Sequence, residues 1–138
     1  MSGCVFCQIR DRQAEGHLVY EDDLVLAFMD LCPVNPGHVL VVPKEHLVGL
    51  GDVPDHVGAR MWSAARRVGQ ALRTGVVRCE GVNLFLADGE AAFQEIFHVH
   101  LHVFPRFSGD PFTIDADWQQ ADRAELETCA AELRAVLG

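Results

Sequence analysis

Three histidines stand at alternate positions, His98, His100 and His102, and apolar residues fill the positions between and around them. The side chains of a β-strand alternate between its two faces, so the pattern predicts a strand over 98–104 with the three imidazoles on one face. Neighbouring imidazoles would then lie about 6.6 Å apart along the strand, from a rise of roughly 3.3 Å per residue. Three imidazoles in register would each need a polar partner if buried, so the pattern indicates chemistry rather than packing.

Two chemical roles fit such a row of histidines. Alternate histidines on a strand can ligate one catalytic zinc ion. Alternatively, one histidine is a nucleophile, because an unperturbed pKa of about 6.5 leaves much of the imidazole neutral near pH 7. The number of other metal ligands in the chain decides between the two roles.

The N-terminal pair Cys4 and Cys7 forms a Cys-x-x-Cys motif, whose thiolates suit zinc and whose spacing presents both sulfurs to one ion. A redox motif would instead be expected at the start of a helix in a βαβ unit, whereas this one precedes a predicted hairpin. His46 and one histidine of the row could complete a Cys₂His₂ tetrahedron. Such a closed site is structural and leaves no open position for substrate.

The remaining apolar patterns predict an antiparallel α+β fold with about five strands. Short runs over 17–20 and 25–29, separated by three acidic residues, indicate a hairpin, and 38–42 and 82–87 indicate further strands, the first stopped by Pro43. Helical spacing predicts a main helix over 55–74 and a C-terminal helix over about 122–138, the latter with Asp122 and Glu125 as a capping box. We expect a single domain over 1–138.

Length and charge narrow the functional classes. With 138 residues, 49% of them hydrophobic, the chain can bury its own core, and its five cysteines are an odd count that argues against a secreted disulfide framework. No stretch approaches the roughly 20 apolar residues of a membrane span, which predicts a cytoplasmic protein without a membrane partner. A net charge of −9 disfavours nucleic acid as a partner, so a phosphate-bearing ligand needs a local site.

Several segments together resemble the histidine-triad (HIT) family of nucleotide-binding proteins. The strongest is the histidine row itself, and the others are Phe28-Met29-Asp30, the stretch Asn35-Pro36-Gly37-His38 through Lys44 with His46, and Gly81-Val82-Asn83. The resemblance spans roughly residues 4–109. It implies a HIT-like fold, a homodimer made by joining sheets with the main helix at the interface, a structural zinc ion and no organic cofactor.

The resemblance also implies roles for individual residues. It makes His100 the nucleophile, with His102 and His38 contacting phosphate and handling protons, and Asp30 holding the ribose hydroxyls. The implied zinc ligands are Cys4, Cys7, His46 and His98. The implied base-pocket residues are Phe6, Phe28 and Leu31, and the implied phosphate-side residues are Asn83 and Gln94.

These roles predict a nucleotide hydrolase or nucleotidyl transferase with a purine nucleotide substrate. Neutral His100 would attack the α-phosphate of a nucleoside phosphoramidate or a dinucleoside polyphosphate, giving a nucleotidyl-histidine that water or another acceptor cleaves. The sequence leaves both substrate classes open. The alternative hypothesis is a nucleotide-binding interaction module with little turnover.

Two positions depart from the family pattern. Phe93 stands before Gln94 where the family usually has glycine, and Asp88 stands where asparagine is common. Phenylalanine adopts positive φ less readily than glycine and could narrow the phosphate entrance, and Asp88 adds negative charge near an anionic substrate. Lys44 and Arg106 could steer such a substrate or be solvated surface residues.

Overall fold

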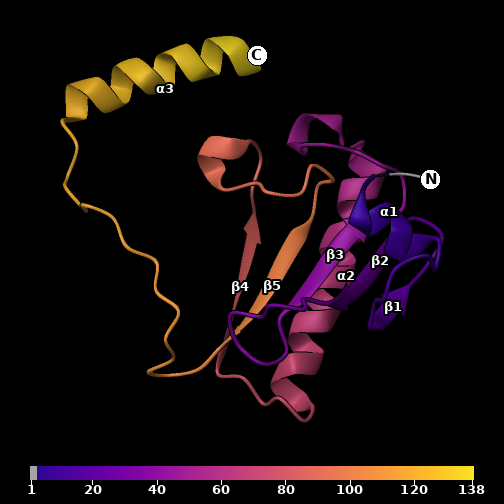
Figure 1. Cartoon of the computed structure of the whole chain (residues 1–138). Helices are drawn as coiled ribbons and strands as arrows, with labels where there is room; N and C mark the ends of the chain where they lie inside the picture. Colours follow the sequence, from indigo (N-terminus) through magenta and orange to yellow (C-terminus); the bar gives the residue numbers. More distant parts are fainter. Residues whose placement is uncertain (1–2) are drawn as a thin grey trace.

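The computed structural model describes residues 3–138, and its centre is a five-stranded antiparallel sheet in the order β1-β2-β3-β5-β4 (Figure 1). This confirms the predicted α+β class. The hairpin strands pair with each other, and β5 lies between β3 and β4. The strands are β1 (Leu18–Glu21), β2 (Val25–Met29), β3 (Val39–Pro43), β4 (Gly81–Leu86) and β5 (Leu101–Arg106).

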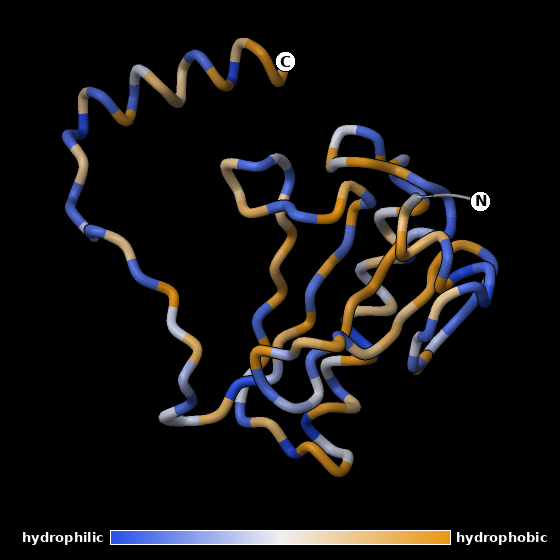
Figure 2. The backbone as a smooth tube through the Cα atoms, in the orientation of Figure 1, coloured by the Kyte–Doolittle hydropathy of each residue, from blue (hydrophilic) through white to orange (hydrophobic). Residues whose placement is uncertain are grey.

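The main helix α2 (Asp55–Thr74) covers one face of the sheet, with the predicted bounds (Figure 1). Alternate residues of β2 and β3, such as Val25 and Val41, pack against its apolar side, where Met61 and Ala65 are buried. The histidine row contributes Val99 and Val103 to this same cluster, so its apolar positions face the helix as expected. Figure 2 shows hydrophobic residues following the strands of the sheet.

A short helix at the N-terminus, α1 (Val5–Arg10), covers the opposite face of the sheet and is absent from the sequence-based prediction. Its Phe6 and Ile9, three residues apart, pack on Leu26, Phe28 and Leu40. Six residues are too few to display a helical period, so only tertiary packing reveals the helix. The helix also corrects the argument against a redox motif, because Cys4 is its N-cap residue and Cys7 lies within it.

The predicted strand over 98–104 is displaced toward its C-terminus. Ladder pairing begins at Leu101, and the segment with His98 and His100 precedes it. Pro105 does not end the strand, which continues to Arg106. Pro105 pairs with Val82 of β4 but lies beyond the last residue that β5 pairs with β3, so its missing N–H interrupts no bond on that side.

The C-terminal helix α3 (Arg123–Leu137) stands apart from the sheet at the end of an extended segment (Figure 1). None of its residues is buried. The predicted capping box is wrong: Asp122 is the N-cap residue, but its side chain makes no cap hydrogen bond. The remaining elements are two single 3₁₀ turns, η1 (Leu50–Asp52) and η2 (Glu90–Ala92). Within residues 3–138, no helix combines the length and apolar character that crossing a membrane requires.

Candidate functional site

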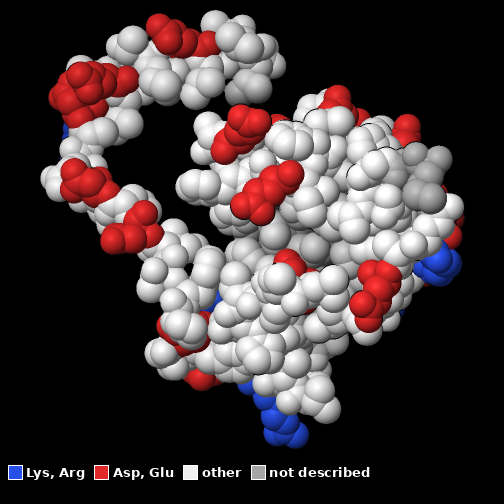
Figure 3. All heavy atoms as spheres, in the orientation of Figure 1, with Lys and Arg blue, Asp and Glu red and all other residues white. Residues whose placement is uncertain are grey.

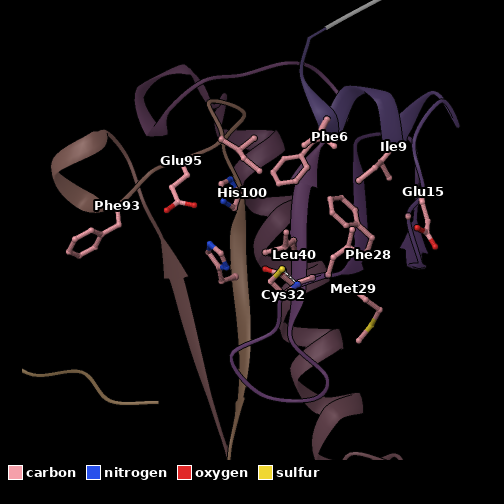
Figure 4. A pocket seen from close by; sticks show the side chains of 16 residues that line it. Phe6, Ile9, Glu15, Phe28, Met29, Cys32, Leu40, Phe93, Glu95 and His100 are labelled. Atoms are coloured by element: carbon pink, nitrogen blue, oxygen red, sulfur yellow. Dashed lines mark hydrogen bonds between the residues drawn. The ribbon is translucent and has the colours of Figure 1, made fainter. Parts of the chain in front are cut away.

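A pocket of about 390 Å³ opens where α1, the end of β2 and the segment before β5 meet (Figure 4). This volume lies in the range of small-molecule sites. Of the predicted site residues, the pocket brings together all three residues of the base site, the ribose carboxylate and two histidines. These are Phe6, Phe28, Asp30, Leu31, His100 and His102.

One side of the pocket is apolar and aromatic. Phe6 of α1 and Phe28 of β2 meet edge to face with ring centroids 5.3 Å apart, and both are almost fully buried. Ile9 and Leu40 extend this wall, and Leu31 lies exposed at the rim. A flat ring system fits such a wall, because its faces and edges match those of the two phenylalanines.

The ring of His100 is fixed by the backbone and by Phe6. Its Nδ1 lies 2.8 Å from the carbonyl oxygen of His98, and its ring centroid lies 5.1 Å from that of Phe6. A carbonyl oxygen only accepts, so Nδ1 carries the proton and Nε2 has a free lone pair. Burial lowers the pKa of His100, against the opposing effects of the His98 carbonyl and Asp30, and keeps the imidazole neutral near pH 7.

His38 and His102 form a hydrogen-bonded chain beside this nucleophile candidate. The backbone N–H of Val34 donates to Nδ1 of His38 over 3.2 Å, so the proton of neutral His38 is on Nε2. That Nε2 lies 2.9 Å from Nδ1 of His102 and 3.4 Å from a carboxylate oxygen of Asp30. His102 therefore accepts at Nδ1, and its own proton is on Nε2, on the opposite side of the ring.

Burial and, to a smaller extent, the neighbouring His100 and His38 lower the pKa of His102 to about 4, against the opposing effect of Asp30. The pKa of His38 is also lowered by burial, although the carboxylate of Asp30 opposes that shift. Both rings are consequently neutral near pH 7 when no ligand is bound.

Asp30, His38 and His102 place three potential metal-ligand atoms within 4.8 Å of one another. A metal ion at Nε2 of His38 would need the ring proton on Nδ1, where it would face the N–H of Val34. The hydrogen bonds therefore favour a proton-handling chain at this position over a metal site.

A second cluster brings together the four predicted zinc ligands. The sulfur of Cys4 lies 3.4 Å from Nδ1 of His98, and the sulfur of Cys7 lies 3.4 Å from Nδ1 of His46 and 3.6 Å from Nδ1 of His98. Zinc bonds of about 2.3 Å to sulfur and about 2.0–2.1 Å to nitrogen place such atoms roughly 3.5 Å apart in a tetrahedron. The donor set and its spacing thus fit a zinc ion.

The protonation state of His98 is also compatible with zinc binding. Its Nε2 donates to the carbonyl oxygen of Pro43 over 2.8 Å, which leaves the Nδ1 lone pair directed at the two sulfurs. Burial lowers the pKa of His98 to about 4, although the Pro43 carbonyl opposes the shift. A buried neutral imidazole with its far nitrogen bonded to the backbone is the usual form of a metal-binding histidine.

Asn83 and Gln94, the predicted phosphate-side residues, are not among the residues that line the pocket. The side-chain oxygen of Asn83 accepts a hydrogen bond from Arg106 over 2.7 Å. Gln94 is buried, and its side-chain amide forms hydrogen bonds with backbone groups. Its oxygen accepts from the N–H of Gly89, and its nitrogen donates to the carbonyl oxygens of Val48 and Ile96. Gln94 therefore braces the loop that leads to the histidine row.

Two residues that follow η2 line the pocket beyond His100, namely Phe93 and Glu95 (Figure 4). Phe93 adopts a left-handed conformation with φ of 71°, the very conformation that glycine would adopt at lower cost. The sequence pointed to Phe93 through its departure from the family pattern, but no pattern singled out Glu95. Asp88 does not line the pocket.

Comparisons with known proteins identify relatives of this chain. A family model for the HIT domain matches residues 11–109. An uncharacterized HIT-like protein of Borreliella burgdorferi is 42% identical over 113 residues, 81% of each chain. An adenylylsulfatase of Arabidopsis thaliana is 36% identical over 107 residues, which are 78% of this chain and 54% of that protein.

Solved structures show the same fold. A protein from Streptococcus mutans UA159 superposes with a TM-score of 0.93 at 31% identity, covering 100% of this chain and 87% of that one. A zinc-bound histidine triad family protein from Mycobacterium smegmatis gives a TM-score of 0.77 at 38% identity, with 97% of both chains covered.

Proposed function

This chain belongs to the histidine-triad (HIT) family of nucleotide-binding proteins, and we propose that it is a nucleotide hydrolase or nucleotidyl transferase with His100 as its nucleophile. The observation that carries the proposal is the hydrogen bond from His100 Nδ1 to the carbonyl oxygen of His98. This bond leaves the Nε2 lone pair of a neutral, buried imidazole in a pocket with an aromatic wall. A purine base fits against the wall that Phe6 and Phe28 form, and Asp30 at the pocket edge suits the ribose hydroxyls of the same nucleoside.

In the first step, Nε2 of His100 forms a bond to the α-phosphorus, and the bond from phosphorus to the leaving group breaks. The electron pair of that bond stays on the leaving atom, which also takes a proton. A bound phosphate favours protonation of the neighbouring His102, so His102 is the donor. Before His102 takes up that proton, the hydrogen bond from His38 to Nδ1 of His102 holds the ring with Nε2 oriented toward the phosphate.

In the second step, water attacks the nucleotidyl-histidine and releases the mononucleotide. His102, now neutral, takes the proton of the attacking water, and the bond between phosphorus and His100 breaks with its electron pair returning to Nε2. The product leaves both histidines in their starting states once His102 loses its proton. Transfer to another acceptor follows the same route with that acceptor in place of water. The adenylylsulfatase among the relatives supports enzymatic chemistry of this kind.

A structural zinc ion completes the proposal, held by Cys4, Cys7, His46 and His98. The spacing of their donor atoms and the zinc-bound relative from M. smegmatis support it. Four protein ligands leave no open position, so such an ion would cross-link the chain and take no part in the reaction. A catalytic zinc ion would instead need an open coordination position for water or substrate.

A homodimer is the proposed assembly, joined along β4 and α2. β4 is an edge strand of the sheet, and two large apolar side chains lie exposed beside it, Trp62 on α2 and Leu84 on β4. Exposed apolar groups next to a free strand edge favour pairing with another sheet.

The direct test is turnover of adenosine 5′-phosphoramidate and of diadenosine tetraphosphate by wild type and by His100→Ala. We expect wild type to release AMP from at least one compound and the variant to lose at least about a hundredfold in kcat/KM, the scale of a removed covalent catalyst. His56→Ala, on the exposed start of α2, is the matched control. Nucleotide binding without turnover by wild type would replace the enzyme with the binding-module hypothesis.

A further inference from the structure

The pocket has two unlike sides, separated by His100 (Figure 4). Phe6, Ile9 and Phe28 lie on one side, and Phe93 and Glu95 lie on the other. A nucleoside on the aromatic wall places its α-phosphate at His100. The second substituent on phosphorus, which is the leaving group, then extends toward Phe93 and Glu95.

The charged side chains that line the pocket are all acidic. Three carboxylates line it, from Glu15, Asp30 and Glu95, and no lining residue among the described ones is Lys or Arg. The two basic residues that could steer an anion are paired elsewhere: Lys44 lies 2.8 Å from a carboxylate oxygen of Glu21, and Arg106 lies 2.8 Å from one of Asp110. Figure 3 shows Asp and Glu gathered on this face, with Lys and Arg at its margins.

Phe93 is held with its ring in solvent at the edge of this pocket. The residue is 81% exposed, and its backbone φ of 71° is unfavourable for a bulky side chain such as phenylalanine. Packing of the exposed ring contributes little stability, so it does not offset the cost of the strained backbone. The presence of phenylalanine at this position therefore needs an explanation other than folding stability. Contact with a bound molecule provides one.

We propose that Phe93 and Glu95 select the leaving group, favouring an aromatic amine of a nucleoside phosphoramidate over a polyphosphate. This inference rests on the proposed function and decides between the two substrate classes that the sequence leaves open. The ring of Phe93 stacks on the aromatic part of the amine, and Glu95 repels the additional phosphates of a dinucleoside polyphosphate.

The chemistry of the step balances with this leaving group. His100 Nε2 bonds to phosphorus, the P–N bond breaks, and its electron pair stays on the amine nitrogen. The proton from His102 makes that nitrogen a neutral amine, which carries no negative charge past Glu95. A polyphosphate leaving group would instead depart as an anion beside that carboxylate.

The experiment compares kcat/KM for three substrates: the tryptamine phosphoramidate of AMP, unsubstituted adenosine 5′-phosphoramidate and diadenosine tetraphosphate. We expect wild type to prefer the tryptamine compound over the unsubstituted one by about tenfold, and Phe93→Gly to abolish that preference. Phe93→Tyr, which restores the ring, should retain it. Glu95→Gln should raise the rate on diadenosine tetraphosphate relative to the unsubstituted compound by about fivefold. Glu15→Gln, the same change on the nucleoside side, is the control and should leave both ratios unchanged.

Each failure has a distinct signature. If wild type turns over the unsubstituted phosphoramidate but the ratios do not respond to Phe93→Gly and Glu95→Gln, the leaving-group inference is wrong and the proposed function stands. If wild type turns over none of the three compounds, the proposed function fails and the inference fails with it. A preference of wild type for diadenosine tetraphosphate would also overturn the inference. A thermal unfolding scan of each variant verifies that it is folded.

Discussion

At the scale of single residues, hydrogen bonds to the backbone determine which ring nitrogen of His100 and of His38 carries the proton. His100 donates to the carbonyl of His98, and His38 accepts from the N–H of Val34, so each ring has one defined tautomer. Under the proposed function, His100 needs no separate base, because burial keeps its imidazole neutral near pH 7. Phe93 combines a left-handed backbone conformation, with φ of 71°, and an exposed aromatic ring.

Phe93→Gly should therefore raise the free energy of unfolding, by about 0.5–1 kcal/mol, since relief of left-handed strain outweighs the added entropy of glycine in the unfolded chain. Denaturant unfolding measures this change. Gly89→Ala is the mirrored control: its φ is +91° and an added Cβ meets nothing within 4 Å, so the variant should lose about 1 kcal/mol through backbone strain alone. A less stable Phe93→Gly would show that the exposed ring makes a contact that stabilises the protein.

At the scale of elements, the acidic turn between β1 and β2 is held by one carboxylate. Asp22 accepts hydrogen bonds from the N–H groups of Leu24 and Val25 and from the hydroxyl of Tyr20, and Arg60 of α2 lies 3.1 Å away. Burial by itself raises the pKa of Asp22, but these bonds outweigh it and lower the pKa to about 2. The turn thus connects the hairpin to the main helix.

A carboxyl whose folded pKa is lowered stabilises the fold above its unfolded pKa and loses that contribution as the pH falls through the folded pKa. For Asp22 the window runs from the ordinary value of 3.8 down to about 2. Asp22→Asn should cost about 1 kcal/mol at neutral pH and remove the corresponding part of the acid destabilisation. Unfolding curves between pH 5 and pH 2 test this. Asp23→Asn, an exposed neighbour that also contacts Arg60, is the control; equal effects of the two substitutions would contradict the prediction.

At the scale of the whole molecule, the cluster of cysteines and histidines joins three distant parts of the chain. α1, the segment after β3 and the segment before β5 meet there, and Cys7 and His98 are 91 residues apart in sequence. A metal ion bound there would stabilise the fold, because the unfolded chain does not hold these ligands together.

Removal of zinc by a chelator should lower the Tm by at least about 5 °C, and purified wild type should contain close to one equivalent of zinc per chain. Cys4→Ser should reduce the zinc content below about half an equivalent. Cys129→Ser, on exposed α3, should change neither quantity. Elemental analysis that finds no zinc in freshly purified wild type would reject the site.

The assembly is tested by mass. Light scattering at micromolar concentration should give twice the chain mass of 15.2 kDa for wild type and the chain mass for Trp62→Glu, because a buried charge at the proposed interface is costly. Val76→Glu, a fully exposed position just after α2, should remain dimeric. A monomeric wild type would remove the proposed dimer.

Local patterns in the sequence determined most elements of this protein. Alternation and helical spacing located the five strands and both long helices, because burial on one face imposes a period of 2 or 3.6 residues. The alternate histidines and the Cys-x-x-Cys motif could be recognised in the sequence for a similar reason, since each pattern depends only on neighbouring residues. The sequence did not predict α1, because six residues display no clear helical period. The observed strand β5 begins later than the predicted strand over 98–104, because pairing with β3 and β4, and not the apolar pattern, determines where the strand begins.

Only the tertiary structure decided which distant groups meet. The approach of His46 to Cys7, the hydrogen bond from His38 to His102 and the diversion of Gln94 to backbone groups depend on how the sheet brings separate segments together. The charge of the pocket was likewise invisible in sequence, because Lys44 and Arg106 could face a ligand until their carboxylate partners were known. The sequence carries the chemical groups, and packing sets the distances between them, on which hydrogen bonds and metal binding depend.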